Sequence, residues 1–425
     1  MAKKKRRRLK KSVRRGCALI IAVPILICLF VFGKDFINLK DFKEQKEEVV
    51  ADEAPASLTT IRERIDHLFQ IPQRLDTATI SLEVYDIASR SVVYSRHANR
   101  LAPPASCLKL LTAVGAMDIL EVNHCYTTQV VARGEQQGNT FRGTLTFQLD
   151  DDPMVETLQP MVDAIYRKGI RRIEGDIELY LMRDDTLKAH STAATWDIPY
   201  NKLPILLKGR ERIEKDLNYL LAAKGVSVVR CEVEHVDADE NVIYRHETPL
   251  REVLAPMLIH SSNIKADGLY GHLHRTADHL PMFSLSEDWW VPILLNRVGG
   301  DHTGFVVNDG SGLSPDNRLT ADFLVRLLAY AWEREDMRRV LLDEALATPA
   351  HPVRHGSLLG RMSAPLYRNR IFVKTGTLTT IGLSSLAGYA KTADGRWLIF
   401  SIINENSPVA ESRIFQDALC REMVR

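Results

Sequence analysis

The sequence predicts an α+β protein, with strands near both ends of its folded body and helices between them. Three observations predict this class. Alternating segments at Thr79–Asp86 and Ser91–Ser95 open the body as strands. The middle, from about Pro249 to Arg334, holds periodic apolar segments typical of helices. The chain then closes with strands and a last helix, an arrangement that favours segregated strands and helices.

The first elements follow from their residue patterns. Leu58–Phe69 is expected to form a short amphipathic helix, and Thr79–Asp86 (TISLEVYD) alternates like a half-buried strand with Ser91–Ser95 as its hairpin partner. Pro103-Pro104 ends regular structure. The segment Ser106–Leu120 is apolar nearly all round, so it is expected to be a helix buried within a large domain.

The remaining elements are justified in the same way. Residues 126–148 combine strand formers with turn glycines and predict β-hairpins. Further helices are expected at Thr157–Lys168, Glu214–Lys224 and Ala321–Arg334, and a long helical region, of one helix or two, at Pro249–Arg275. Strands are expected at Arg172–Leu181, Ile371–Thr375, Leu383–Lys391 and Trp397–Asn404, and a final helix at Val409–Val424.

Charge is unevenly distributed along the 425 residues. The chain carries 56 basic and 54 acidic residues, and ten of the basic ones lie within residues 1–15. The rest of the chain therefore has 46 basic against 54 acidic residues, a net charge of −8. A folded body with this balance argues against nucleic acid as a partner, because binding to phosphates needs basic surface. Six cysteines are too few for a disulfide scaffold.

The N-terminus predicts a membrane anchor. Residues 1–16 form a basic cytoplasmic tail, residues 17–33 an apolar run (CALIIAVPILICLFVFG), and residues 34–57 a charged linker. Seventeen helical residues span about 25 Å, and the basic flank orients the anchor with the body outside. The prediction is a single-pass protein of the inner membrane with its body in the periplasm or another extracytoplasmic space. A cleaved signal peptide is the main alternative, although no small-x-small site follows. A nuclear-localisation signal is a weaker one.

Three short motifs bear residues that could do chemistry. Ser106-Cys107-Leu108-Lys109 begins the buried helix, where a serine and a lysine three residues apart share one face. Ser261-Ser262-Asn263 lies in the helical region, and Lys374-Thr375-Gly376-Thr377 ends a predicted strand. Each has an ordinary structural explanation as well: an N-cap serine, polar residues at a helix junction, and a strand end with a turn glycine. A second S-x-x-K also occurs, at Ser262–Lys265.

Together, in the order S-x-x-K, S-x-N, K-T-G, the motifs resemble those of active-site serine penicillin-binding proteins and β-lactamases. Three further segments resemble the penicillin-binding protein 4-type D-alanyl-D-alanine carboxypeptidase/endopeptidase family: the lead-in Pro104-Ala105 before Ser106, the box Asn308–Ser314, and the block Gly356–Met362. The resemblance covers about residues 75–405. It implies a serine β-lactamase/transpeptidase-like fold, with an antiparallel sheet flanked by helices, a helical region and an inserted β-rich domain.

The family places an insertion between S-x-x-K and S-x-N, and here 151 residues separate Lys109 from Ser261. The predicted organisation is a transpeptidase-like domain in two parts, residues 58–124 and 236–425, with residues 125–235 as the inserted domain. Ser262 stands where the family often has Asp. The family's second inserted domain is expected to be absent or vestigial.

The resemblance implies a serine-type D-Ala-D-Ala carboxypeptidase, with DD-endopeptidase activity left open, that acts on peptidoglycan peptides through an acyl-enzyme. Catalytic roles would fall to Ser106, Lys109, Ser261, Asn263 and Lys374, and substrate binding to Thr375, Gly376 and Thr377. The backbone N–H groups of Ser106 and Thr377 would form the oxyanion hole. Neither a metal nor another cofactor is expected, and His272 and His274 are interpreted as exposed helix residues.

β-Lactam antibiotics are expected to act as inhibitors, because no E-x-x-x-N box for rapid deacylation follows the S-x-N motif. A non-catalytic alternative remains: a membrane-tethered penicillin-binding sensor or a structural homologue. Against it, both Lys109 and Lys374 are present, and only about fifteen residues precede the apolar run. These observations favour an enzyme.

Overall fold

The computed structural model describes residues 60–71, 73–181, 204–231, 240–276 and 289–425. Residues Thr59–Arg425 form one compact unit, and the predicted tail, anchor and linker lie outside the described residues. Among the described residues, no helix combines the length and the apolar character that crossing a membrane requires.

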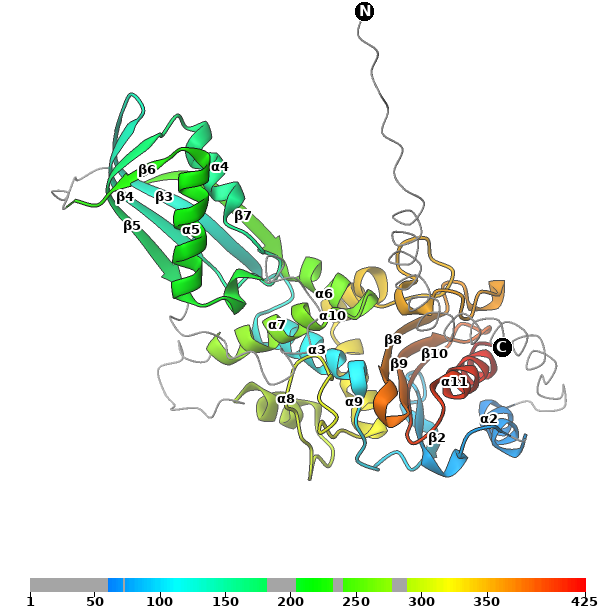
Figure 1. Ribbon diagram of the computed structural model, residues 1–425. Coiled ribbons are helices and arrows are strands. Elements are labelled where there is room, and N and C mark those ends of the chain that lie inside the picture. Colours follow the sequence, from blue (N-terminus) through cyan, green and yellow to red (C-terminus); the bar gives the residue numbers. More distant parts are fainter. Residues whose placement is uncertain (1–59, 72, 182–203, 232–239, 277–288) are drawn as a thin grey trace, which may run out of the picture. The chain divides into compact units, whose positions relative to one another are not determined.

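The first sheet joins the two ends of this unit. Its five strands run in the order β2-β1-β10-β9-β8, and every neighbouring pair is antiparallel. The predicted strands are confirmed, and β1 pairs with β10 across more than 300 residues of sequence (Figure 1). The bounds are β1 Ile80–Asp86, β2 Ser91–Arg96, β8 Ile371–Leu378, β9 Leu383–Lys391 and β10 Trp397–Asn404.

Both faces of this sheet are buried, each against helices. Strand β10 shows the alternation, because Leu398, Phe400 and Ile402 pack into one core while Ile399 and Ile403 pack into the other. The first core also contains residues of α2 (Ile61–Gln70) and α11 (Val409–Val424), and the second contains residues of α3 (Lys109–Ile119) and α9 (Ala321–Trp332). A helix therefore stands on each side of the strands.

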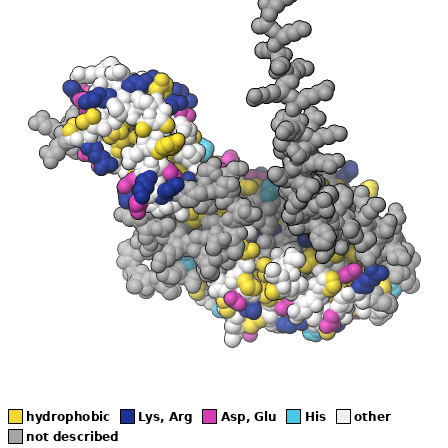
Figure 2. Space-filling view, in the orientation of Figure 1, with side chains coloured by type: hydrophobic (Ala, Val, Ile, Leu, Met, Phe, Trp, Pro, Cys, Tyr) yellow, Lys and Arg dark blue, Asp and Glu magenta, His cyan; other side chains and the backbone are white. Residues whose placement is uncertain are grey.

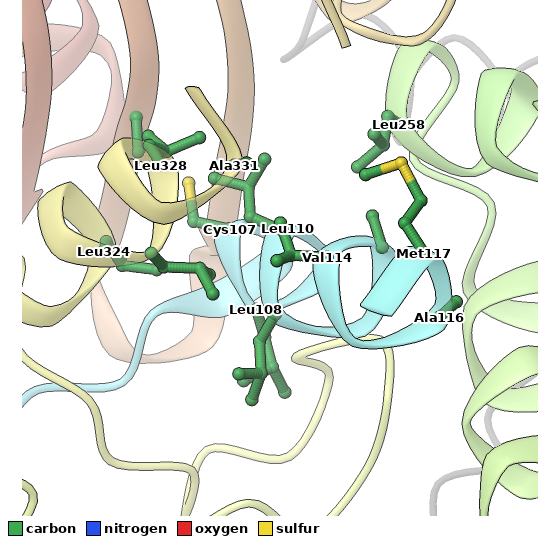
Figure 3. Close-up of a cluster of buried hydrophobic side chains, with 14 of the residues drawn as sticks. Cys107, Leu108, Leu110, Val114, Ala116, Met117, Leu258, Leu324, Leu328 and Ala331 are labelled. Atoms are coloured by element: carbon green, nitrogen blue, oxygen red, sulfur yellow. The ribbon is translucent and has the colours of Figure 1, made fainter. Parts of the chain in front are cut away.

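Helix α3 is the central element of the larger core. Its residues from Lys109 to Met117 are all buried, in agreement with the prediction of an apolar, enclosed helix. Figure 3 shows Met117 close to Leu258 of α6 (Leu250–Ile259) and Cys107, just before α3, close to Leu328 of α9. A Cβ added at Gly115 would lie 2.3 Å from Trp290, so the helix is also packed closely on that side.

The predicted helical region Pro249–Arg275 is two helices, α6 (Leu250–Ile259) and α7 (Asn263–Thr276). The break between them is sharp, and Ser261 within it has a φ of +58°. Helix α8 (Trp290–Val298) was not expected from the sequence. Helix α9 is followed by α10 (Glu335–Arg339) and a π-helical turn, Val340–Ala345.

A second sheet forms between the S-x-x-K and S-x-N motifs. Its strand order is β6-β5-β4-β3-β7, and α4 and α5 lie beside it (Figure 1). Side chains of the sheet and of these two helices form a separate apolar core. The predicted hairpin is confirmed as β3–β4, and the helices and β5 also lie where expected. The bounds are β3 Cys125–Gln137, β4 Thr140–Leu149, α4 Gln159–Arg167, β5 Arg172–Leu181, α5 Arg210–Lys224, β6 Ser227–Val229 and β7 Asn241–Pro249.

The second sheet ends later in the sequence than residue 235. Strand β7 pairs with β3 from Cys125↔Pro249 to Ala132↔Asn241, so its residues complete this sheet rather than begin the C-terminal part. The sequence did not identify β7 as a strand. In the view of Figure 2, Lys and Arg side chains on the described surface alternate with acidic, polar and apolar ones.

Candidate active site

Ser106 lies on a strained backbone turn that leads into the buried helix α3. It lies on the 3₁₀ turn Ala105–Leu108, which leads directly into α3. Ala105 has a φ of +47° and is 1% exposed, so a left-handed residue is held in place by tight surroundings. Ser106 itself is only half-buried. The turn thus presents one hydroxyl toward the surface from an otherwise enclosed segment.

Gly312 packs directly against this turn. Its φ is +77°, and an added Cβ would lie 1.8 Å from the carbonyl oxygen of Ala105. We expect Gly312→Ala to lower the melting temperature far more than Gly395→Ala. Gly395 is a matched control, since it has a φ of +89° but nothing within 4 Å of its added Cβ. Strain alone costs about 1–2 kcal/mol, and the clash adds to it. Equal losses in a thermal melt would contradict this account of Gly312.

Lys109 is fully buried and makes three polar contacts. Its Nζ lies 3.0 Å from Ser106 Oγ, 2.8 Å from Asn263 Oδ1 and 2.6 Å from the carbonyl oxygen of Ser311. The predicted pair Ser106–Lys109 is therefore within hydrogen-bond distance, and Asn263 reaches the same amine from α7. These three positions satisfy the donors of an ammonium group.

The carboxylate of Asp309 holds the loop that carries the Ser311 carbonyl in position. Oδ1 of Asp309 accepts hydrogen bonds from the backbone N–H groups of Ser311 (3.0 Å) and Gly312 (2.5 Å), and its Oδ2 accepts one from Ser314 (2.7 Å). The carbonyl of Gly310 accepts from Thr112 of α3 at 2.7 Å. The loop Asp309–Ser314 is thus fixed against the helix that carries Lys109.

Burial and the neighbouring charges both shift the pKa of Lys109. Burial, followed by the positive charge of Lys374, lowers the pKa of Lys109 to about 7, although Asp267 and Asp309 pull the pKa upward. An amine with a pKa near neutrality is available as a base at physiological pH. Once neutral, Lys109 can accept the proton of the Ser106 hydroxyl, which needs such a base to act as a nucleophile.

A second lysine and serine face the same site. Lys374 of β8 is fully buried, and its Nζ donates to Ser261 Oγ at 3.0 Å and to the carbonyl oxygen of Thr375 at 2.7 Å. Burial lowers the pKa of Lys374 to about 8. The left-handed backbone of Ser261 turns its hydroxyl toward β8, and Lys374 can exchange a proton with it.

The two lysines predict a bell-shaped pH profile for acylation by penicillin. The rate should rise as the pH passes about 7, because only neutral Lys109 removes the serine proton. It should fall above about 8, where Lys374 loses the proton that it shares with Ser261. The second-order rate constant, measured from about pH 5 to 10, checks this. A rate that does not change between pH 6 and 8 would exclude Lys109 as the base.

The three predicted binding residues end strand β8. Thr375 Oγ1 lies 2.5 Å from Ser357 Oγ, and Thr377 Oγ1 donates to the carbonyl oxygen of Gly376 at 2.8 Å. A Cβ added at Gly376 would lie 2.2 Å from Ser385 Oγ and 2.9 Å from the carbonyl oxygen of Pro104. Gly376 therefore allows β8 to lie directly beside the turn that carries Ser106.

Cys107 joins the turn to the strand beneath the site. The buried thiol donates to the carbonyl oxygen of Lys374 at 3.2 Å, and Ser385 Oγ of β9 donates to the carbonyl of Pro104 at 2.7 Å. Burial raises the pKa of this thiol, so it stays protonated and unreactive. Its contacts are structural and fix the distance between Ser106 and β8.

The second S-x-x-K does not form a similar pair. Ser262 Oγ accepts the backbone N–H of Lys265 at 3.4 Å, while Lys265 Nζ extends to the carbonyl oxygen of Pro153 at 2.6 Å. Ser262 is thus a helix cap and Lys265 is directed to the loop after β4. The two segments share the S-x-x-K pattern, but only Ser106 and Lys109 lie within hydrogen-bond distance of each other.

The histidine interpretation is wrong for His272. It is 3% exposed and lies against Tyr126, with ring centroids 5.0 Å apart, because α7 packs against the start of β3. Among the residues that the structure describes, no group of three or more His, Cys, Asp or Glu side chains could hold a metal ion.

Several residues of this site were not identified as such in the sequence. The Ser311 carbonyl acts through the backbone, which a side-chain motif does not reveal, and the box Asn308–Ser314 was noticed only as a resemblance. Ser357 and Arg413 reach the end of β8 from distant segments, and Arg413 Nη2 lies 3.2 Å from Thr377 Oγ1. Ser357 lies within the block Gly356–Met362, which was noticed only as a resemblance, and no local pattern distinguishes Arg413 from other surface residues.

Comparisons with known sequences agree with this arrangement. The model of the D-Ala-D-Ala carboxypeptidase 3 (S13) family matches residues 61–202 and 208–422. A D-alanyl-D-alanine carboxypeptidase of Actinomadura sp. (strain R39) is 24% identical over 480 residues, which cover 87% of this chain and 85% of that protein. Carboxypeptidase DacB of Mycolicibacterium smegmatis is 25% identical over 366 residues, which cover 78% of this chain and 77% of that protein.

Solved structures share the fold. Penicillin binding protein 4 (dacB) of Haemophilus influenzae superimposes with a TM-score of 0.65 at 18% identity, over 85% of this chain and 99% of that one. Bd3459, a predatory peptidoglycan endopeptidase of Bdellovibrio bacteriovorus, gives a TM-score of 0.52 at 15% identity, over 78% and 86%. These matches confirm the predicted α+β, transpeptidase-like fold class.

Proposed function

The chain belongs to the D-Ala-D-Ala carboxypeptidase 3 (S13) family, and from this premise we propose how its own residues carry out the reaction. It is a serine-type D-Ala-D-Ala carboxypeptidase/endopeptidase that acts on peptidoglycan peptides. The observation that carries the assignment of residues is the buried amine of Lys109, 3.0 Å from the half-buried hydroxyl of Ser106.

In acylation, neutral Lys109 takes the proton of Ser106 as Oγ attacks the carbonyl carbon between two D-alanines. Asn263 and the Ser311 carbonyl hold the amine of Lys109 in line during this transfer. The backbone N–H groups of Ser106 and Thr377 stabilise the oxyanion, and each such donor is worth about 3 kcal/mol. The carbon–nitrogen bond breaks, and the leaving amine takes a proton from Ser261, which Lys374 resupplies.

Before deacylation, Lys109 releases the proton that it gained from Ser106, and Lys374 regains from solvent the proton that it gave up. Neutral Lys109 then takes a proton from the water that attacks the ester carbonyl and passes it to the Ser106 oxygen as the ester bond breaks, which regenerates the hydroxyl. A penicillin would be trapped at the intermediate stage, because its leaving group remains tethered to the acyl part. Among the solved relatives, the Haemophilus influenzae protein is also described in complex with a β-lactam. The same Ser106 ester would form here, which makes β-lactams inhibitors.

Incubating the purified protein with cross-linked muropeptides tests the proposed function. Mass spectrometry distinguishes loss of one terminal alanine, the carboxypeptidase product, from a cross-linked dimer split into monomers, the endopeptidase product. Either product that disappears when the protein is treated with penicillin first supports the assignment. Unchanged muropeptides, with a protein that binds penicillin, would favour the sensor alternative.

We also propose that residues 17–33 anchor the protein in the cytoplasmic membrane with the catalytic body outside. The support is the apolar run with its ten preceding basic residues and a substrate that lies outside the membrane. Protease added to spheroplasts of the producing cells should digest the body and leave the tail protected. A protected body, or a mature N-terminus near residue 34, would overturn the anchor.

A further inference from the structure

We propose that Arg413 is the cationic binding site for the carboxylate of the substrate, which lies next to the scissile bond. This inference rests on the proposed function, because it assigns a further residue to the same site. It would make the enzyme selective for peptides with a free terminal carboxylate and for β-lactams with a free carboxyl group.

Arg413 approaches the site from the last helix of the chain. It lies in the second turn of α11 (Val409–Val424), and its Nη2 donates to Thr377 Oγ1 at 3.2 Å. That contact uses one of the five N–H donors of a guanidinium group. Thr377 Oγ1 gives its own proton to the Gly376 carbonyl, so Arg413 is a hydrogen-bond donor directly at the end of β8.

The position of α11 beside Thr377 is fixed by buried contacts. Nε2 of Gln416, which is fully buried, donates to Ser384 Oγ at 3.1 Å and to Asn404 Oδ1 at 2.9 Å. Ser384 is the residue paired with Thr377 in the β8–β9 register. The helix is therefore tied to the sheet at the same level as Thr377, and a fixed backbone orients Arg413.

The charge of Arg413 is not neutralised locally. Within the described part of the chain, no carboxylate oxygen lies within 4 Å of its guanidinium. Asp417, whose charge raises the pKa of Arg413, is itself engaged by Arg361, whose Nη2 and Nε lie 2.7 and 2.9 Å from Asp417 Oδ1. Burial and the charge of Arg361 lower the pKa of Arg413, but a guanidinium stays protonated in proteins.

A half-buried cation without an anionic partner is costly unless a ligand supplies the anion. Lys374 and Thr375 lie on the same part of β8 and add an ammonium group and a hydroxyl group. A carboxylate is planar and accepts two parallel N–H donors from an arginine, which a hydroxyl group cannot do. The end of β8 and Arg413 together thus match a carboxylate rather than a neutral amide.

The test compares each substrate with a partner that lacks the carboxylate. Turnover is measured for a peptide ending in D-Ala-D-Ala and for its C-terminal amide, and acylation is measured for penicillin and for its carboxyl ester. In Arg413→Gln, kcat/KM for the acid should fall about 10- to 100-fold, since hydrogen bonds to charged groups contribute about 1.5–3 kcal/mol. The amide should be affected much less, and Arg413→Lys should recover part of the preference.

For each variant, kcat/KM for the acid peptide is divided by kcat/KM for the amide peptide, and both values come from one protein sample. Partial unfolding lowers both values equally and leaves this acid-to-amide ratio unchanged. Arg90→Gln serves as the matched control, because Arg90 is an exposed arginine paired with Glu333, and its ratio should equal that of the wild type. A wild-type protein that turns over neither peptide and reacts with no penicillin would overturn the proposed function itself. An active wild type whose acid-to-amide ratio survives Arg413→Gln would overturn only the role of Arg413.

Discussion

Replacement of Ser106 by alanine is expected to abolish covalent labelling by a fluorescent penicillin. The acyl-enzyme ester needs the Oγ that Lys109 contacts at 3.0 Å, and no hydroxyl at Ser262 replaces it, because that group caps α7. Wild type and Ser262→Ala should be labelled at equal intensity after denaturing electrophoresis. Each protein would first be shown to unfold at a comparable temperature.

Labelling of Ser106→Ala would require another nucleophile and would refute the assignment. The pair of serines is informative because both begin an S-x-x-K motif. Only the environment differs, so the contrast tests the geometry of the site rather than the presence of a motif.

Replacement of Lys109 by methionine is expected to slow penicillin acylation by about 10²–10⁴-fold, the contribution that a positioned general base makes. Methionine approximates the shape of the lysine stem without the amine. Stopped-flow or gel-based measurement of the second-order rate constant gives the effect. Lys265→Met is the matched control, since Lys265 extends to the Pro153 carbonyl, and its rate constant should stay near that of the wild type.

The pH profiles of the two lysine variants are also expected to differ. Lys109→Met removes the amine whose pKa is about 7, so the residual activity should lose the rising limb near pH 7, whereas Lys265→Met should keep it. A variant that keeps both its rate and that limb would show that another group, not Lys109, deprotonates Ser106.

Much of the fold could be predicted from local patterns. The strands of the first sheet alternate or carry continuous apolar residues, and α3 is apolar on all sides, so each element was visible in the sequence. Strand β7 and helix α8 were not, and the second sheet extends to Pro249 because β7 pairs with β3. Pairing between distant strands depends on the tertiary fold, which one short segment does not encode.

Some residues of the site could likewise be predicted from local sequence, and others could not. Ser106 and Lys109 are three residues apart on one helical turn, so their contact follows from helical spacing. Asn263 and Ser261 were located by resemblance, and the structure brings them to Lys109 and Lys374 respectively. Arg413 could not be identified in advance, and Ser357 was noticed only as part of the block Gly356–Met362, because each meets the end of β8 only through the packing of α11 or of the loop at Gly356.

Gly356 illustrates why such packing is hard to anticipate. Its φ is +47°, and an added Cβ would lie 2.0 Å from the carbonyl oxygen of Ile259, at the end of α6. The loop that carries Ser357 can therefore approach the break between α6 and α7 only with glycine at this position. Neither the close approach nor its partner, about 100 residues earlier in the chain, is apparent from the sequence around Gly356.

Ser106 is expected to form the acyl-enzyme, and locating the adduct on the chain tests this assignment. The full-length protein is treated with penicillin, its intact mass is determined, and proteolytic peptides are sequenced by mass spectrometry. The account predicts one added penicillin per chain, on the peptide that contains Ser106 and on that residue. An adduct on Ser261, on Ser262 or on any other residue, or no adduct at all, would contradict it.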